Sequence, residues 1–192
     1  MNEVKFQRSS LIEIAIEAGL EISQVYASTD QEEQSVEYKS DNSPITEADR
    51  RAHLLIDKKL KLLTPSIPRL SEEGLYHEYT ERSKWNRYWL IDPLDGTKEF
   101  INRNGEFTVN IALIENGLPV MGVVHVPCSE KTYFGSIEDG AWCFDGLNSG
   151  QKMKTSQCHD PLRVVASRRH RGQFLENFIK MIEESIGPVS TK

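Results

Sequence analysis

Residues 92–97, with the sequence DPLDGT, combine two aspartates, a proline and a Gly-Thr pair in a pattern that suits metal binding. Mg²⁺ prefers oxygen ligands in an octahedron, and Asp92 and Asp95 supply two carboxylates. Pro93 fixes its own φ angle and restricts the residue before it, so the chain between the acids is stiff and the carbonyl of Leu94 can face the same ion. The segment therefore predicts a site for hard cations. A solvent-facing turn is the alternative, since Asp, Pro and Gly are also common turn residues.

The end of the same segment suits an anion. Gly96 lets the backbone approach a ligand closely, and a helix that begins near Thr97 would present free N–H groups beside the cations. A metal and a phosphate together make use of every residue of the segment.

Two other acid-rich motifs are excluded by their spacing. The aspartyl-phosphatase signature of the haloacid-dehalogenase type has one residue between its acids, whereas two residues separate Asp92 from Asp95. An EF-hand loop that begins at Asp92 requires an oxygen-bearing side chain at its third position and Glu at its twelfth, where this chain has Leu94 and Arg103. Neither signature explains the segment.

Further acids lie upstream of the segment. Glu72 and Glu73, in LSEEG, follow a short strand and precede a glycine turn. Asp49, in ITEAD, stands three residues after Thr46, which is the spacing of a capping box with Asp in place of the usual Glu. Taken singly, the Glu pair is typical of a solvated turn and Asp49 is typical of a helix cap.

Two helices are predicted before the acidic segment. From residues 9–10, two serines that can cap a helix, apolar residues recur with helical spacing to about Tyr26. A second helical pattern begins after Thr46 and ends at Pro65. The polar, turn-rich stretch between these helices, which ends at Pro44, predicts a surface loop or hairpin.

After Pro65 the pattern changes to a period of two, which is typical of strands. The predicted strands are RLSEE, YWLID, FTVNIALI, LPVMGVVHVP, the meander KTYFGSIEDGAWCFDG, and LRVVAS. A last helix with apolar residues from Phe174 to Ile186 is closed by Gly187 and Pro188. Helices that lead into a largely antiparallel sheet predict a layered α/β sandwich, with residues 1–150 as one lobe and 151–192 as the start of a second.

Several other positions are interpreted as structural. Trp85 and Trp89 are predicted to lie in the core, and His53 to pack beside the second helix or lie at the surface. The three cysteines are an odd number without CxxC spacing, so reduced thiols are expected rather than a disulfide framework or a zinc cage. They are Cys128, Cys143 and Cys158.

The composition of the 192 residues, 38% hydrophobic and 27% charged, predicts a globular protein rather than a disordered one. The formal net charge of −6 gives no general attraction for nucleic acid or an anionic membrane. The amino-terminal sequence lacks the pattern of a signal peptide, and no run approaches the roughly 18 apolar residues of a spanning helix. We therefore expect a cytoplasmic protein.

The order of ITEAD, LSEEG and WLIDPLDGTKEF resembles the inositol monophosphatase superfamily of Mg²⁺-dependent, lithium-sensitive phosphatases. The resemblance runs from about Leu11 to the end of the chain, and it implies a layered αβαβα sandwich. The combination of DGTKEF with RNGEFTVNIALI and KSDNSPITEAD is similar to the bisphosphate nucleotidase branch, whose substrate is adenosine 3′,5′-bisphosphate. Inositol phosphatases more often have DGTTNF at the first of these places.

The resemblance implies roles for particular residues. Asp49 and Thr97 would be catalytic, because in the family a threonine hydroxyl oriented by the aspartate helps a metal-bound water to attack. Two or more Mg²⁺ ions would be held by Glu72, Asp92, Asp95 and the carbonyl of Leu94. The residues implied to contact the substrate are Glu72, Leu94, Asp95, Gly96, Thr97, Lys98, Ser167 and His170.

The segment SRRHR, residues 167–171, has two interpretations. A charge cluster is usually an exposed basic loop. In the nucleotidase branch the matching element faces the nucleotide, so Ser167 and His170 would be substrate contacts and the three arginines would supply positive charge for the second phosphate. Lys192 corresponds either to a substrate lysine of the branch or to a frayed end.

The function implied is hydrolysis of the 3′-phosphate of adenosine 3′,5′-bisphosphate, a by-product of sulfate assimilation. The alternatives are an inositol-1-monophosphatase and a non-catalytic phosphate-binding fragment. The family's second signature, of the WDxAA type, is absent because the sequence stops at Lys192, so this chain alone is expected to be weakly active or to aggregate. A monomer or homodimer is expected, without nucleic acid and without a membrane span. Peripheral association with the inner face of the cell membrane stays open.

Overall fold

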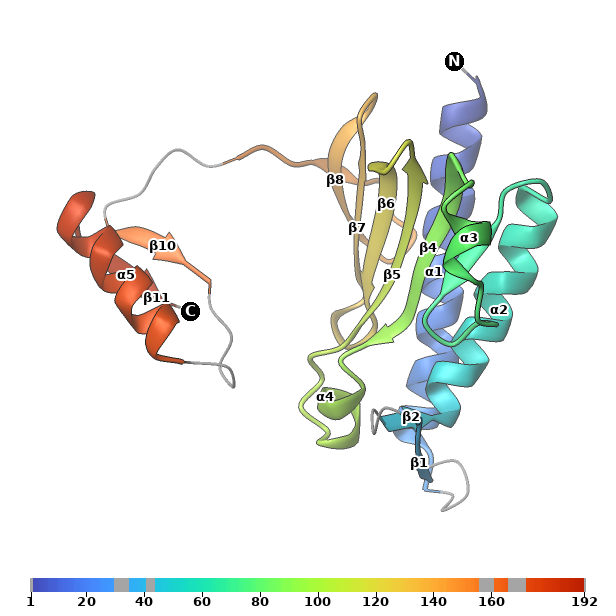
Figure 1. Cartoon of the computed structure of the whole chain (residues 1–192), viewed down its shortest axis with the longest axis horizontal. Helices are drawn as coiled ribbons and strands as arrows, with labels where there is room; N and C mark the ends of the chain where they lie inside the picture. Colours follow the sequence, from blue (N-terminus) through green and yellow to red (C-terminus); the bar gives the residue numbers. More distant parts are fainter. Residues whose placement is uncertain (1, 30–34, 41–43, 156–160, 166–171, 192) are drawn as a thin grey trace. The chain divides into compact units, whose positions relative to one another are not determined.

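A computed structural model describes residues 2–29, 35–40, 44–155, 161–165 and 172–191 (Figure 1). The chain divides into two compact units, Met1–Met153 and Lys154–Lys192. The larger unit contains the acidic segment that the sequence singles out.

Two long helices form one layer of the larger unit. They are α1 (Asn2–Ala27) and α2 (Glu47–Leu63). Each buries one stripe of apolar side chains spaced three, four or seven residues apart, as expected of an amphipathic helix packed on a core. The fully buried members of these stripes are Leu11, Ala15, Ala18, Ile22, Ala48, Ala52, Ile56 and Leu60.

The second layer is a seven-stranded sheet with the order β3-β4-β5-β6-β7-β8-β9. Only the pair β3–β4 is parallel, and every other neighbouring pair is antiparallel. The strands are β3 (Arg69–Ser71), β4 (Arg87–Asp95), β5 (Thr108–Glu115), β6 (Leu118–Val126), β7 (Lys131–Ser136), β8 (Gly140–Asp145) and β9 (Gln151–Lys152).

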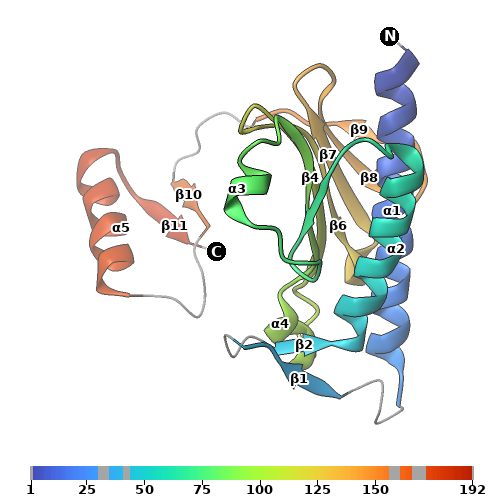
Figure 2. The ribbon, with the colours of Figure 1, turned by 45° about the vertical axis from the view of Figure 1, so that its right-hand side comes forward.

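Both long helices cover the same face of this sheet (Figure 2). Successive residues of a strand point to opposite faces, so Trp89 and Ile91 of β4 are buried while Leu90 between them is 44% exposed. The Trp89 indole N–H donates to Thr64 Oγ1 at 2.9 Å, just after α2. The core therefore lies between the two helices and one face of the sheet.

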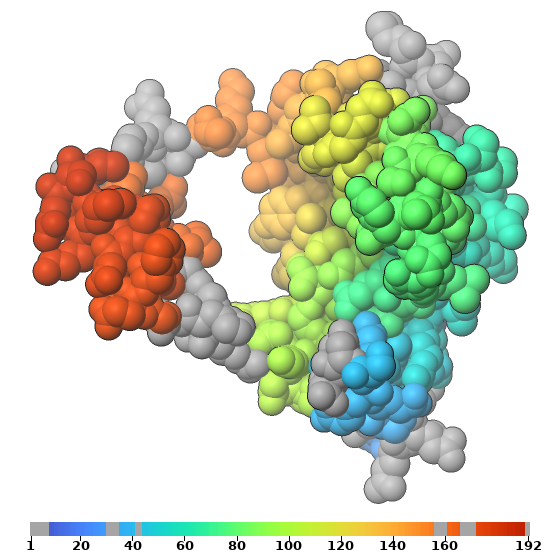
Figure 3. Space-filling view, in the orientation of Figure 1, coloured from blue at the N-terminus to red at the C-terminus, as the bar shows by residue number. Residues whose placement is uncertain are grey.

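Shorter elements complete the larger unit. The strands β1 (Val36–Tyr38) and β2 (Pro44–Thr46) pair as an antiparallel hairpin. The short helices are α3 (Tyr79–Arg82), α4 (Thr97–Ile101) and the 3₁₀ turn Pro127–Ser129. The segment that contains α3 stands at the surface of this unit, in green in Figure 3.

The smaller unit is a single strand-helix-strand motif. The strands β10 (Leu162–Val164) and β11 (Val189–Thr191) pair in parallel, and α5 (Gln173–Ser185) connects them. A parallel pair needs such a crossover connection, since a tight turn cannot join parallel strands.

The layered α/β class is confirmed, and most predicted elements are present. The prediction that α1 begins at residues 9–10 is wrong, because the helix already starts at Asn2. The prediction that Trp85 lies in the core is also wrong, because this side chain is partly exposed beyond the end of α3 and outside the core cluster. Cys128 and Cys143 are free thiols, and Cys158 lies outside the described residues. Among the residues described, no helix is long and apolar enough to cross a membrane.

Candidate functional site

The parallel pair β3–β4 brings two acids to one edge of the sheet. Ser71 lies opposite Ile91, and the N–H of Glu72 donates to the carbonyl of Ile91 at 3.0 Å. Glu72 directly follows β3, and the parallel register places it beside Asp92, the residue after Ile91 in β4. Two carboxylates that are 20 residues apart in sequence therefore become neighbours.

A local irregularity in β4 separates the two aspartates of the segment. The register between β4 and β5 shifts between Asp92, opposite Asn110, and Asp95, opposite Thr108. Pro93 cannot donate to the ladder, which makes this the place where regular pairing fails. The Asp95 carboxylate accepts a hydrogen bond from Asn110 Nδ2 at 3.0 Å, so the bulged chain has a defined position.

Gly96 allows the sharp change of direction from β4 into α4. Its φ angle is +99°, in the region that side-chain-bearing residues rarely adopt. A Cβ atom at this position would lie 2.9 Å from the carbonyl oxygen of Glu106. The turn therefore requires glycine for two independent reasons, and it places Thr97 at the first position of α4.

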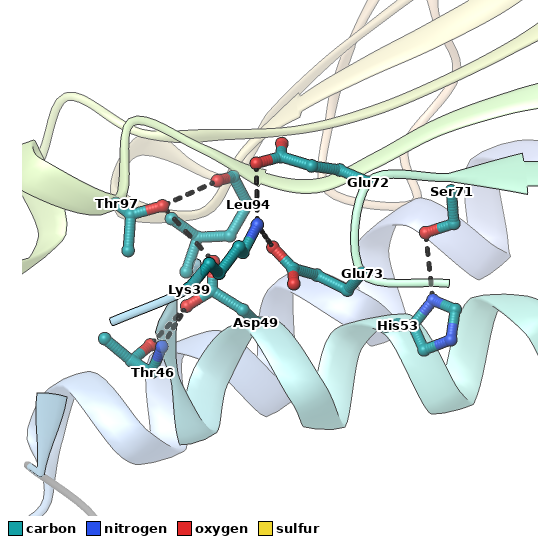
Figure 4. Close-up of polar contacts among 9 residues, drawn as sticks. All are labelled: Lys39, Thr46, Asp49, His53, Ser71, Glu72, Glu73, Leu94 and Thr97. Atoms are coloured by element: carbon teal, nitrogen blue, oxygen red, sulfur yellow. Dashed lines mark hydrogen bonds and ion pairs between the residues drawn. The ribbon is translucent and has the colours of Figure 1, made fainter. Parts of the chain in front are cut away.

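Asp49 and Thr97 meet at the start of α2 (Figure 4). Asp49 is 1% exposed, and its Oδ2 accepts hydrogen bonds from Thr46 N at 2.7 Å and from Thr46 Oγ1 at 2.5 Å. Thr97 Oγ1 lies 3.2 Å from Asp49 Oδ1 and 3.4 Å from the carbonyl oxygen of Leu94. Asp49 is thus both the capping acid of α2 and the partner of the threonine hydroxyl.

Lys39, from the β1–β2 hairpin, inserts its ammonium group between the two glutamates (Figure 4). Its Nζ lies 2.9 Å from Glu72 Oε1 and 2.6 Å from Glu73 Oε1. Burial lowers the pKa of Lys39, but the hydrogen bonds and charges of the two glutamates outweigh it and raise that pKa. A cation already neutralises part of the acidic edge.

Among the acids of the site, Asp92 has the least favourable environment for a negative charge. Its Oδ1 is buried and has no hydrogen-bond partner among the described residues. Burial first, and then the negative charges of Glu72 and Asp95, raise the pKa of Asp92 to about 7. Burial also raises the pKa of Glu73 and of Asp49, in each case against hydrogen bonds that lower it.

These features fit a hard divalent cation. An unpartnered buried carboxylate oxygen and crowded acids whose repulsion raises a pKa are the features that a bound cation relieves. In the present arrangement, the described His, Cys, Asp and Glu side chains form no group of three that could hold an ion. The carboxylate of Glu72 instead contacts Lys39.

The predicted site residues fall into two sets. Asp49, Thr97 and Leu94 are brought together by hydrogen bonds, and Glu72, Asp92 and Asp95 interact through their charges. Lys98 is exposed on α4. Ser167, His170, the three arginines of SRRHR and Lys192 lie outside the described residues. His53, interpreted as packing or surface, is partly exposed and its Nδ1 lies 2.9 Å from Ser71 Oγ.

Two residues at the site were not predicted from the sequence. Lys39 carries no local signal, because its contact with Glu72 and Glu73 depends on where the β1–β2 hairpin lies. Asn110 stands within an alternating strand, where a polar residue every second position is ordinary.

The sequence matches the inositol monophosphatase family over residues 7–186. The 3′(2′),5′-bisphosphate nucleotidase CysQ of Escherichia coli K12 is 44% identical over 172 residues, which are 90% of this chain and 68% of the relative. The protein of the same name from Buchnera aphidicola is 46% identical over 149 residues, 78% of this chain and 55% of the relative. The chain therefore spans 55–68% of the length of these relatives.

Solved structures of other proteins are similar to this chain in fold. CysQ from Bacteroides thetaiotaomicron is 38% identical, with a TM-score of 0.80 over 95% of this chain and 70% of that protein. The Thermotoga maritima IMPase, 24% identical with a TM-score of 0.70, shares the fold.

Proposed function

The chain belongs to the inositol monophosphatase family, and on that premise we propose that it is a Mg²⁺-dependent 3′(2′),5′-bisphosphate nucleotidase. The reaction is hydrolysis of the 3′-phosphate of adenosine 3′,5′-bisphosphate to AMP and phosphate. The observation that carries the metal dependence is the buried, unpartnered oxygen of Asp92 beside Glu72 and Asp95. The choice of substrate is supported by the identities of 40–46% to proteins named for that activity.

Glu72, Asp92, Asp95 and the carbonyl of Leu94 would hold two or more Mg²⁺ ions. When bound, Mg²⁺ neutralises charge on the phosphate oxygens and lowers the pKa of a coordinated water. Glu72 now pairs with Lys39, so metal binding by this carboxylate would require it to exchange Lys39 for the ion, and Lys39 could retain Glu73.

Thr97 and Asp49 would handle the proton of the attacking water. The Thr97 hydroxyl has one proton and donates it toward Asp49 Oδ1, which leaves its oxygen free to accept a hydrogen bond from water. Burial raises the pKa of Asp49, so this carboxylate is a better proton acceptor than an exposed aspartate. The proton can therefore pass from the water to Thr97 Oγ1 as the threonine proton moves to Asp49.

The first turn of α4 would bind the phosphate. The N–H groups of Gly96 and Thr97 precede the point where intrahelical hydrogen bonds begin, so they have no acceptor within the helix. Lys98, Ser167 and His170 would contact the rest of the nucleotide.

We also propose that Li⁺ inhibits the enzyme, that the enzyme is cytoplasmic, and that it clears a by-product of sulfate assimilation.

The test is phosphate release from adenosine 3′,5′-bisphosphate and from inositol 1-phosphate, with Mg²⁺, with Mg²⁺ plus Li⁺, and with a chelator. Preferential release from the nucleotide, dependent on Mg²⁺ and inhibited by Li⁺, is expected. Asp92→Asn should abolish it, whereas Asp145→Asn, an exposed acid at the end of β8, should not. Faster turnover of inositol 1-phosphate would make the protein an inositol monophosphatase. Stabilisation by Mg²⁺ and phosphate without any turnover would leave a phosphate-binding protein.

A further inference from the structure

A cavity lies at the opposite end of β4 from the acids. Its volume is about 340 Å³, within the range of roughly 300–1,000 Å³ that small-molecule sites occupy. The cavity is lined by α3, by the chain that leads from α3 into β4, and by the turn Asn116–Gly117 between β5 and β6. Asp92 and Asp95 stand at the far end of the same strand, so this cavity is separate from the proposed phosphatase site.

Aromatic rings form the walls of this cavity. The rings of Trp85 and Tyr88 have centroids 6.0 Å apart, and the ring of His77 meets Trp85 edge-on at 4.9 Å. Tyr79 is 68% exposed, and Trp85 is partly exposed, in contrast to the fully buried Trp89. Aromatic faces left open in a concave site can stack against a further ring.

The cavity also contains a cation without an acidic partner. Arg82 lies over the ring of Tyr79, with its guanidinium carbon 5.6 Å from the ring centroid. In the part of the chain that the structure describes, no carboxylate pairs with Arg82. Its neighbours are engaged otherwise, because Arg87 Nε lies 3.8 Å from Glu115 Oε1 and Glu81 Oε1 lies 3.4 Å from His77 Nδ1.

We propose that this cavity binds a small molecule that carries one planar aromatic ring and one anionic group. The ring stacks against Trp85 and Tyr88, and the anion, whether carboxylate, sulfonate or phosphate, accepts hydrogen bonds from the planar fork of Arg82. Asn86 and Asn116 line the cavity, and a side-chain amide can offer both donors and acceptors to polar ring substituents.

The test uses 2-naphthoate as the probe and the whole 192-residue chain. Titrations are made with a chelator present, because the metal-free acidic edge repels anions and does not compete for the probe. The readout is the set of indole N–H signals in ¹⁵N-labelled protein, which come from Trp85, Trp89 and Trp142 and are assigned by Trp→Phe variants. We expect a saturable shift of the Trp85 signal alone, with a Kd of about 1 mM or below.

Two variants separate the ring contact from the charge contact. Arg82→Gln, on the surface of α3, should weaken 2-naphthoate binding about tenfold, since it removes a charge-assisted hydrogen bond. Lys131→Gln removes an exposed cation from β7 and should leave the Kd unchanged. The neutral analogue 2-naphthalenemethanol should bind the unchanged protein more weakly than 2-naphthoate does. The two probes should bind Arg82→Gln with equal affinity.

The proposal is overturned if the Trp85 signal does not move, or if Arg82→Gln binds 2-naphthoate as tightly as the unchanged protein does. Equal affinity for the neutral and anionic probes would likewise remove the role of Arg82. None of these results depends on phosphatase activity, so they are independent of the function proposed above.

Discussion

Thr97 Oγ1 lies 3.2 Å from Asp49 Oδ1, although 48 residues separate the two positions. One comes from the first turn of α4 and the other from the first turn of α2. The contact therefore joins the start of the helix that would bind phosphate to the start of a helix fixed in the core.

Thr97→Val keeps the shape of the side chain and removes the hydroxyl that contacts Asp49. We expect phosphate release from adenosine 3′,5′-bisphosphate to fall by about 10²–10⁴-fold, the usual contribution of a positioned proton-transfer group. Thr97→Ser keeps the hydroxyl and should retain most of the activity. Comparison of kcat for the two variants, with circular dichroism to check folding, tests this role. Unchanged kcat in Thr97→Val, or an equal loss in Thr97→Ser, would contradict a role of the hydroxyl alone.

Gly96→Ala should disturb the turn between β4 and α4 more than an ordinary glycine substitution does. Gly117 is a matched control, because its φ angle is +78° but a Cβ there meets no atom within 4 Å. Gly117→Ala should cost about 1 kcal/mol for the left-handed conformation alone. Gly96→Ala adds a contact of 2.9 Å with a backbone oxygen, so a larger drop in unfolding free energy is expected, together with lost phosphate binding. If Gly96→Ala and Gly117→Ala lower the unfolding free energy equally in urea titrations, the turn at Gly96 relaxes to accept the Cβ atom.

Asp92→Asn should stabilise the metal-free protein while abolishing activity. The pKa of Asp92 rises from 3.8 to about 7 in the folded state, so the folded state binds more protons than the unfolded state between these values. Stability of the metal-free protein should therefore fall as pH rises from about 4 to 7. Asp92→Asn removes that slope.

Thermal unfolding at several pH values, with chelator and with Mg²⁺, measures this effect of Asp92. A gain of 1 kcal/mol corresponds to about 2–4 °C in Tm for a domain of this size. Mg²⁺ should raise Tm more at pH 8, where Asp92 is ionised, than at pH 5. A variant no more stable than the parent at pH 8 in chelator would contradict the prediction.

His125 should give the opposite pH dependence. It is 4% exposed, its Nδ1 lies 2.9 Å from Thr132 Oγ1, and burial lowers its pKa from 6.5 to about 4. Between those values the unfolded state binds the extra proton, so this contribution to stability is complete above about pH 6.5 and is lost as pH falls toward 4. The measurement is the urea midpoint of unfolding at several pH values with chelator present. His125→Gln should reduce the fall of this midpoint between about pH 6.5 and pH 4. An equally steep fall of the urea midpoint toward acid pH in His125→Gln and in the parent would contradict the prediction.

Local chemistry in the sequence was sufficient for much of this arrangement. The spacing of Thr46 and Asp49 predicts the start of α2, because a capping box depends on four consecutive residues. The alternation in β5 predicts which side chains are buried. The position of Lys39 between Glu72 and Glu73 could not be predicted, since it depends on how a hairpin packs against a distant strand. The prediction that Trp85 lies in the core has no periodic pattern to support it, and the side chain lies outside the core cluster.

The packing of α1 against β5 and β6 has a consequence for synthesis of the protein. The helix is made first and can pack on α2 early, but its apolar stripe, with Leu11 and Ile22, gains its partners in the sheet only when β5 and β6 have left the ribosome. At about 5–20 residues per second, the roughly 90 residues between Ala27 and Leu118 take about 5–20 s to translate. During that interval the side of α1 that packs on the sheet has no partner, and we expect chaperones that bind exposed apolar segments to recognise it.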